Sequence, residues 1–73
     1  MDSIQKYTRS GSYKGIEFDV EIWHFDTGEV MVQAVQIDGE RPRKLADGHR
    51  DLVDVEDAFQ LGSEIAREAI DRR

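Results

Sequence analysis

The chain has 73 residues, no cysteine and a net charge of −6 that arises from 16 acidic and 10 basic side chains. A chain of this length forms one small domain, which buries only about 60% of the surface that its unfolded form exposes. The absence of cysteine excludes disulfides and thiolate zinc sites as sources of stability. The acidic total disfavours nonspecific binding to nucleic acid.

The first twelve residues, Met1–Ser12, are mostly polar and lack the periodicity of a strand or helix. They end in Ser-Gly-Ser, so we expect a flexible tail that precedes a single domain over residues 13–73. The tail has no apolar stretch typical of a secretion signal, and no apolar run in the chain is long enough to cross a bilayer. We therefore expect a cytoplasmic protein without membrane contacts.

Residues 16–22 read Ile-Glu-Phe-Asp-Val-Glu-Ile, which alternates apolar and acidic side chains without a break. This pattern predicts a strand with one apolar face and one charged face, and we place the strand over Tyr13–Phe25. Asp26–Glu29 has the composition of a tight turn, in which Gly28 supplies a positive φ. A second strand, Val30–Ile37, then completes a hairpin.

Asp38-Gly39 is a second hairpin signal, and it precedes a third predicted strand over Arg41–Ala46. Pro42 has no main-chain N–H to donate to a neighbouring strand. We therefore expect the third strand at an edge of the sheet.

The last predicted element is a helix that begins after Asp54, a good N-cap. Glu56 and Asp57 lie in its first turn and Arg72 and Arg73 at its end, as the helix dipole favours. At 100° per residue the apolar and small residues form one continuous arc, and the polar residues of 55–72 fall outside it. The arc contains Val55, Ala58, Phe59, Leu61, Gly62, Ile65, Ala66, Ala69 and Ile70.

Together these elements predict an α+β fold, in which a three-stranded antiparallel β-meander packs on one C-terminal α-helix (β-β-β-α). We assume a two-residue loop at Thr27-Gly28, which determines the register of the first hairpin. The expected core side chains of the sheet are Ile16, Phe18, Val20, Ile22, Met31, Val35 and Ile37. The opposite, open face then carries Glu17, Asp19, Glu21, Trp23, Phe25, Val30, Val32 and Ala34.

The open face is the candidate partner-binding surface, because exposed apolar patches and tryptophan are typical of protein interfaces. Its apolar part consists of Trp23, Phe25, Val30 and Val32, and its acidic part consists of Glu17, Asp19 and Glu21. Two alternatives stay open: the apolar cluster stabilises only its own hairpin, or it mediates a homodimer. A β-bulge in the hairpin would exchange the faces.

The other motifs of the sequence do not indicate a catalytic or metal-binding site. Asp26-Thr27-Gly28 matches the tripeptide of aspartic proteases, but it occurs once and in a turn of a chain too short for that family. Asp47, His49 and Asp51, with His24, form a loose set of metal ligands of a kind that is common by chance. We predict no enzyme activity, no metal, no cofactor and no small-molecule substrate.

Arg41, Arg43, Lys44 and Arg50 form the basic segment of the chain. This segment is interpreted as a solvated edge, so nucleic-acid binding is not expected.

Tyr13-x-Gly15 enters the first predicted strand, and Val35-x-Ile37-x-Gly39 leaves the second. Residues 13–72 resemble short uncharacterised proteobacterial proteins in these two motifs and in the order of the elements, which is strand, strand, strand, helix. That resemblance implies a fold and no activity.

The same order of elements is similar to the latter part of a double-stranded-RNA-binding domain, whose final helix presents lysines to phosphates. In this chain Asp54, Glu56 and Asp57 occupy the start of that helix, and the first helix of the family is missing. RNA binding is therefore not carried over from the resemblance.

The leading hypothesis is a noncatalytic protein-interaction module that binds a partner, or itself, through the open sheet face. The second hypothesis is an acidic inhibitor or immunity-type protein that neutralises a basic enzyme, with Glu17, Asp19 and Glu21 in the place of phosphates.

Overall fold

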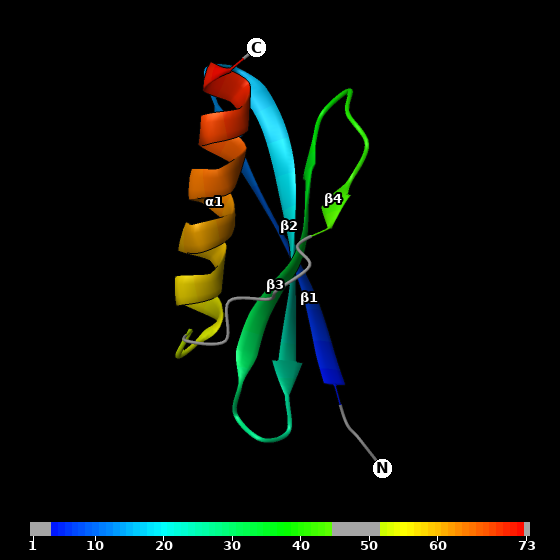
Figure 1. The fold of residues 1–73 in the computed structure, drawn as a ribbon, viewed down its shortest axis with the longest axis vertical. Coiled ribbons are helices and arrows are strands. Elements are labelled where there is room, and N and C mark those ends of the chain that lie inside the picture. Colours follow the sequence, from blue (N-terminus) through cyan, green and yellow to red (C-terminus); the bar gives the residue numbers. More distant parts are fainter. Residues whose placement is uncertain (1–3, 45–51, 73) are drawn as a thin grey trace.

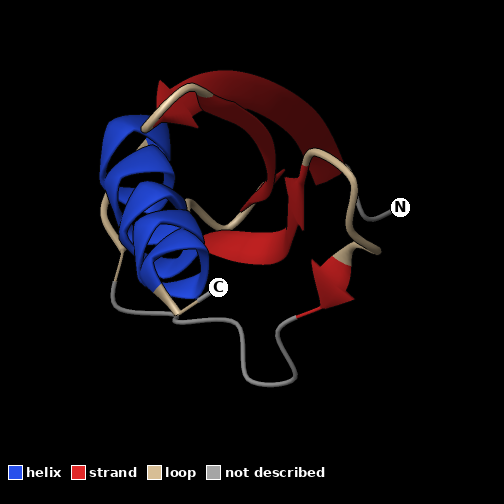
Figure 2. Cartoon of the chain, turned by 90° about the horizontal axis from the view of Figure 1, so that it is seen from above, coloured by secondary structure: helices blue, strands red, loops and turns tan. Residues whose placement is uncertain are grey.

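The fold is an antiparallel sheet with one helix packed across it, and a computed structural model describes residues 4–44 and 52–72. Its elements are β1 (Ile4–Tyr13), β2 (Ile16–Phe25), β3 (Val30–Ile37), β4 (Arg43–Lys44) and α1 (Val55–Asp71) (Figure 1). The strands pair in the order β1-β2-β3-β4. They curve around one side of α1, as the view from above shows (Figure 2). The predicted α+β class, an antiparallel meander followed by a C-terminal helix, is confirmed.

The N-terminal segment differs from the expected flexible tail, because residues 4–12 belong to β1. The predicted first strand, Tyr13–Phe25, is divided by a turn at Lys14 and Gly15, whose φ angles are 52° and 77°. Two successive positive φ angles are typical of the type I′ turn that joins antiparallel strands through two residues. Ten consecutive residue pairs, from Ile4 with Phe25 to Tyr13 with Ile16, connect β1 to β2.

The hairpin of β2 and β3 also has a register that differs from the expected one. The main-chain N–H of Phe25 donates to the carbonyl of Glu29 (2.8 Å), so the loop is longer than the two residues assumed. Glu21 pairs with Ala34 but Ile22 pairs with Val32, which leaves Gln33 as the extra residue of a β-bulge. The bulge exchanges the faces of β3 between Gln33 and the turn.

After β3 the chain turns at Asp38-Gly39, as expected, and Gly39 has a φ of 82°. Among the described residues of the third predicted strand, Arg43 and Lys44 pair with β3, so the strand begins later than Arg41. Arg41 and Pro42 lie outside the strand, and residues 45 and 46 lie outside the described residues. The edge position of this strand is confirmed.

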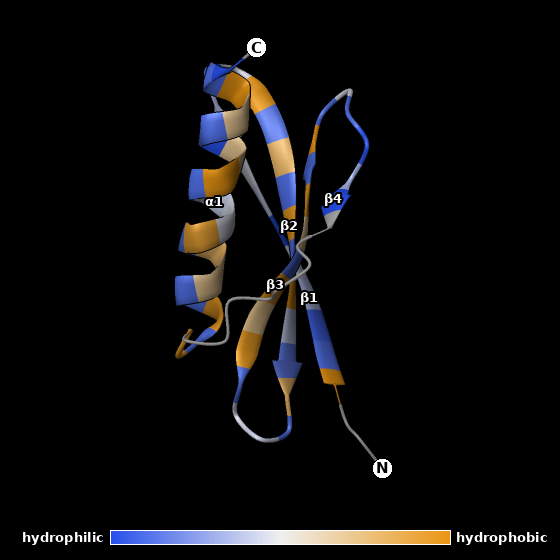
Figure 3. Ribbon diagram, viewed as in Figure 1, coloured by the Kyte–Doolittle hydropathy of each residue, from blue (hydrophilic) through white to orange (hydrophobic). Residues whose placement is uncertain are grey.

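The predicted helix is confirmed at its N-terminus, where an Asp54 carboxylate oxygen accepts a hydrogen bond from the main-chain N–H of Asp57 (2.8 Å). Its apolar side faces the sheet, and hydrophilic residues follow its outer side (Figure 3). Ser63 was expected outside the apolar arc but is buried. Within the described residues, α1 lacks the length and the apolar character that crossing a membrane requires.

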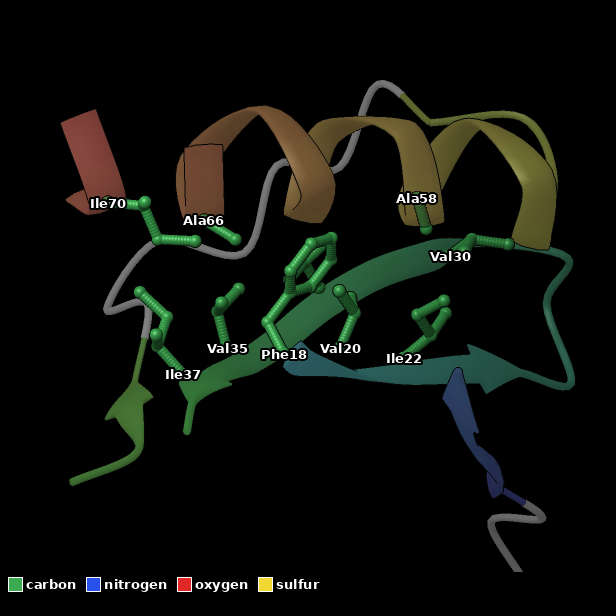
Figure 4. Packing of buried hydrophobic residues seen from close by; sticks show 10 residues of the cluster. Phe18, Val20, Ile22, Val30, Val35, Ile37, Ala58, Ala66 and Ile70 are labelled. Carbon is green, nitrogen blue, oxygen red and sulfur yellow. The ribbon is translucent and has the colours of Figure 1, made fainter. Parts of the chain in front are cut away.

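The core lies between α1 and the inner face of the sheet. Phe18, Val20 and Ile22 point from β2 toward Ala58 and Ala66 of the helix (Figure 4). The small helix residues allow a close approach of the two layers. Among the described residues, the buried apolar side chains are Phe18, Val20, Ile22, Val30, Val32, Val35, Ile37, Ala58, Ala66 and Ile70.

Candidate functional site

The sheet face opposite α1 is the candidate site, and β1 and β2 supply most of its side chains. Side chains that are directly opposite each other in an antiparallel pair share a face, so each open-face residue of β2 has a neighbour on β1. The neighbours are Ile4 with Phe25, Lys6 with Trp23, Thr8 with Glu21, Ser10 with Asp19 and Ser12 with Glu17. The open face is therefore aromatic at one end and acidic at the other.

The aromatic end consists of Trp23 and Phe25, whose rings meet edge to face with centroids 6.4 Å apart. The Lys6 ammonium lies over the Trp23 ring, 4.9 Å from its centroid, in a cation–π contact. Met31 of β3 is opposite Trp23 on the other side. Trp23 Nε1 is buried and has no acceptor among the described residues. Both aromatic residues are half-buried, so this end offers a small, ordered apolar surface.

Val30 and Val32, which were expected on the open face, are fully buried under α1. The physical reason is the bulge at Gln33, which turns both valines inward and turns Met31, expected in the core, outward. The prediction that Val30 and Val32 belong to an apolar patch on the open face is therefore wrong. The remaining aromatic end is smaller than expected.

The acidic row consists of Glu17, Asp19 and Glu21, which occupy alternate positions of β2 as expected. Glu17 and Asp19 are exposed and Glu21 is half-buried. The Ser10 hydroxyl donates a hydrogen bond to Asp19 Oδ1 at 2.5 Å, which holds that carboxylate in place. The acidic row lines two adjoining hollows of the open face, whose shared members are Asp19 and Gln36.

The acidic row takes part in none of the ion pairs of the described residues, which lie elsewhere on the molecule. Arg9 pairs with Glu56 at the start of α1, Lys14 with Asp71 (2.7 Å), Arg43 with Glu40 (2.9 Å) and Arg72 with Glu68 (2.5 Å). Three of these pairs involve the helix. The negative charge of the acidic row is therefore not compensated by any ion pair within the described residues.

The pair of Lys14 and Asp71 also changes two pKa values. The hydrogen bond from Lys14 lowers the pKa of the Asp71 carboxyl below its usual value, and the Tyr13 hydroxyl adds a weaker hydrogen bond of 3.2 Å. In turn the hydrogen bond to Asp71 and the carboxylate charge raise the pKa of Lys14. This pair ties the turn after β1 to the end of α1, on the side of the sheet away from the acidic row.

The other motifs lie apart from the open face. Asp26, Thr27 and Gly28 form the β2–β3 turn, and Gly28 has the expected positive φ, 93°. His24 occupies the helix side of β2, next to Ile22 and opposite Val30. The metal-ligand candidates Asp47, His49 and Asp51, together with Arg50 of the basic segment, lie outside the described residues. Among residues 4–44 and 52–72, no three His, Asp or Glu side chains are grouped to hold a metal ion.

The β1 residues of the open face were missed because the strand was expected to be a tail. The signal that would have found them is Lys14-Gly15, the two-residue turn that joins β1 to β2. Comparison with known proteins adds no relative, since no protein-family model, curated protein or solved structure matches this chain.

Proposed function

We propose that this protein is a noncatalytic protein-interaction module that binds a positively charged partner protein through the open face of its sheet. An acidic inhibitor or immunity-type protein that neutralises a basic enzyme is one form of such a module. A cytoplasmic location belongs to the same proposal.

The observation that supports the proposal is the acidic row, Glu17, Asp19 and Glu21, with no ion pair to any described cation. Carboxylates in one line attract a basic surface at long range and fix its register on contact. The ordered pair of Trp23 and Phe25 at the end of the acidic row supplies an apolar anchor of the type that is enriched at interfaces.

The same face is less suited to a homodimer. Two copies that met with their acidic rows face to face would repel each other, since like charges in a desolvated contact cost several kcal/mol. The burial of Val30 and Val32 also leaves less apolar surface to offset that cost. A partner with the opposite charge avoids the repulsion, so the proposal favours a different protein.

The test compares proteins captured from cell extract by the immobilised wild type and by Asp19→Lys. Glu64→Lys is the matched control, because Glu64 is exposed on α1 and receives the same change of charge. We expect a basic protein that binds the wild type and Glu64→Lys but binds Asp19→Lys about tenfold more weakly. Salt at 1 M, where the Debye length is about 3 Å, should release it.

Equal capture by the two lysine variants, or capture that survives 1 M salt, would contradict a charge-based partner. Light scattering of the free protein provides the second arm. A stable dimer that Trp23→Ala converts to a monomer would assign the open face to self-association.

A further inference from the structure

The two edges of the sheet differ in how they are protected against pairing with another strand. At one edge the described part of β4 has two residues and follows Pro42, and β3 beside it carries the bulge at Gln33. Short strands, proline and bulges are the usual means of blocking an edge. At the other edge β1 has ten residues, no proline and no shift of register in its ten pairs with β2. The described part of the chain places no strand beside its outer side.

The two cations of β1 protect its edge only weakly. Lys6 lies over the Trp23 ring, and Arg9 pairs with Glu56 of the helix. Both side chains are therefore held against their own molecule. Because both charges are already engaged within the molecule, they oppose an approaching strand less than free edge cations would.

The outward main-chain groups of β1 belong to alternate residues. In a two-residue type I′ hairpin the residues that flank the turn, here Tyr13 and Ile16, form a hydrogen-bonded pair. Because hydrogen-bonded pairs alternate along an antiparallel ladder, the odd-numbered residues of β1 direct their N–H and C=O groups toward β2. The even-numbered residues, among them Thr8, Ser10 and Ser12, direct theirs outward.

These even-numbered residues also lie on the open face, directly in front of the acidic row. Thr8 is opposite Glu21, Ser10 opposite Asp19 and Ser12 opposite Glu17. Their side chains are short, so a lysine or arginine on a strand added next to β1 reaches over them toward the carboxylates. The distance between that added strand and β2 is about 9.6 Å, twice the spacing of neighbouring strands.

We infer that the outer edge of β1 binds an extended basic segment of the partner by strand addition, with lysine or arginine at alternate positions opposite Thr8, Ser10 and Ser12. Main-chain hydrogen bonds to β1 provide the pairing, and the acidic row selects the charge. This inference rests on the proposed function and specifies how the partner is held.

The test uses the peptide acetyl-Lys-Thr-Lys-Thr-Lys-Thr-Lys-amide and an NMR titration of the labelled protein. We expect slowed hydrogen exchange at the amides of Thr8, Ser10 and Ser12, whose N–H groups gain partners. The amides of Arg9 and Gly11, which already face β2, should change little. The same peptide with glutamate in place of lysine should not bind.

Two further pairs of variants separate strand addition from binding across the face. Ser10→Pro removes an outward N–H and leaves the ladder to β2 intact, whereas Ser10→Ala removes only the hydroxyl. We expect at least tenfold weaker binding of the peptide by Ser10→Pro and less than threefold by Ser10→Ala. In antiparallel pairing the lysine amides of the peptide face β1, so N-methylation of the lysines should abolish binding while N-methylation of the threonines preserves it.

The outcomes distinguish the two proposals. If the peptide shifts the side chains of Glu17, Asp19 and Glu21 but protects no β1 amide, strand addition is wrong and the proposed function stands. Equal binding of the two N-methylated peptides would also show that strand addition is wrong. This comparison remains valid if Ser10→Pro disturbs the fold, because it changes only the peptide. If the lysine peptide changes neither the carboxylates nor β1, both proposals fail.

Discussion

Val20 fills the space that a side chain at Gly62 would need. A β-carbon built on Gly62 would lie under 3.0 Å from both γ-methyl groups of Val20, a separation that real β-carbons essentially never show. Val20 is fully buried in the middle of β2, and its branched side chain has few alternative rotamers. The contact therefore sets the distance between α1 and the sheet at this point.

Replacing Gly62 with alanine should destabilise the protein, although alanine favours a helix over glycine by about 1 kcal/mol. Overpacking of a core costs about 1–3 kcal/mol, so we expect a net loss of about 1 kcal/mol in the free energy of unfolding, measured with urea. Gln60→Ala, on the exposed side of α1, is the control for propensity and should change stability by less than about 0.5 kcal/mol. If Gly62→Ala were more stable than the wild type, α1 and the sheet could move apart at this point without a loss in the free energy of unfolding.

The bulge at Gln33 makes opposite predictions for two neighbouring residues. Val32 is fully buried and Met31 is on the open face, so Val32→Ala should cost about 2 kcal/mol of unfolding free energy and Met31→Ala less than about 1 kcal/mol. The bulge-free register would reverse this order. Urea denaturation of both variants decides between the two registers.

The pair of Lys14 and Asp71 should make stability depend on pH at both extremes. The pKa of Asp71 is lowered, so its contribution is present above the unfolded-state value of 3.8 and is lost as the pH falls through the folded-state pKa. The pKa of Lys14 is raised, so its contribution is present below 10.5 and is lost as the pH rises through the folded-state pKa.

The comparison is between wild type and Asp71→Asn, by thermal unfolding from acid to alkaline pH. The wild type should be more stable at neutral pH, and the difference should vanish well below pH 3.8. Because both side chains are largely exposed, 1 M salt should also reduce it. A difference that persists unchanged in acid would show that the ion pair is not its source.

The helix cap gives a further prediction. Asp54→Ala removes the acceptor for the Asp57 N–H and should cost about 1 kcal/mol of unfolding free energy. Asp54→Asn retains an acceptor oxygen and should stay within about 0.5 kcal/mol of the wild type. Equal losses in the two variants would indicate that charge, and not the hydrogen bond, stabilises the start of α1.

The helix and the inner face of β2 were predictable because local signals and burial agree. Asp54 caps the helix, and the alternation of Phe18, Val20 and Ile22 with acids matches the side-chain direction of a strand. These residues occupy the positions that their own sequence pattern indicates. No distant contact has to override that pattern.

The strand β1 and the faces of β3 were not predictable in the same way. β1 has few apolar residues and contains Ser-Gly-Ser, so pairing with β2 and contacts such as Arg9 with Glu56 hold it in place, and burial contributes little. Gln33 carries no residue-type signal of a bulge, so only its pairing reveals the exchange of Val30 and Val32. The acidic row itself was predicted. Its position opposite Thr8, Ser10 and Ser12 of β1 was not.

The asymmetry of the two edges limits what the protein can assemble into. A sheet that is open on both sides propagates into filaments, since each added molecule offers a new site for the next. Here Pro42, the described residues of β4 and the bulge of β3 block one side, so two molecules joined through β1 would have no second open strand in the described part of the chain. Growth would stop at a pair, and complexes of this fold should have a finite stoichiometry.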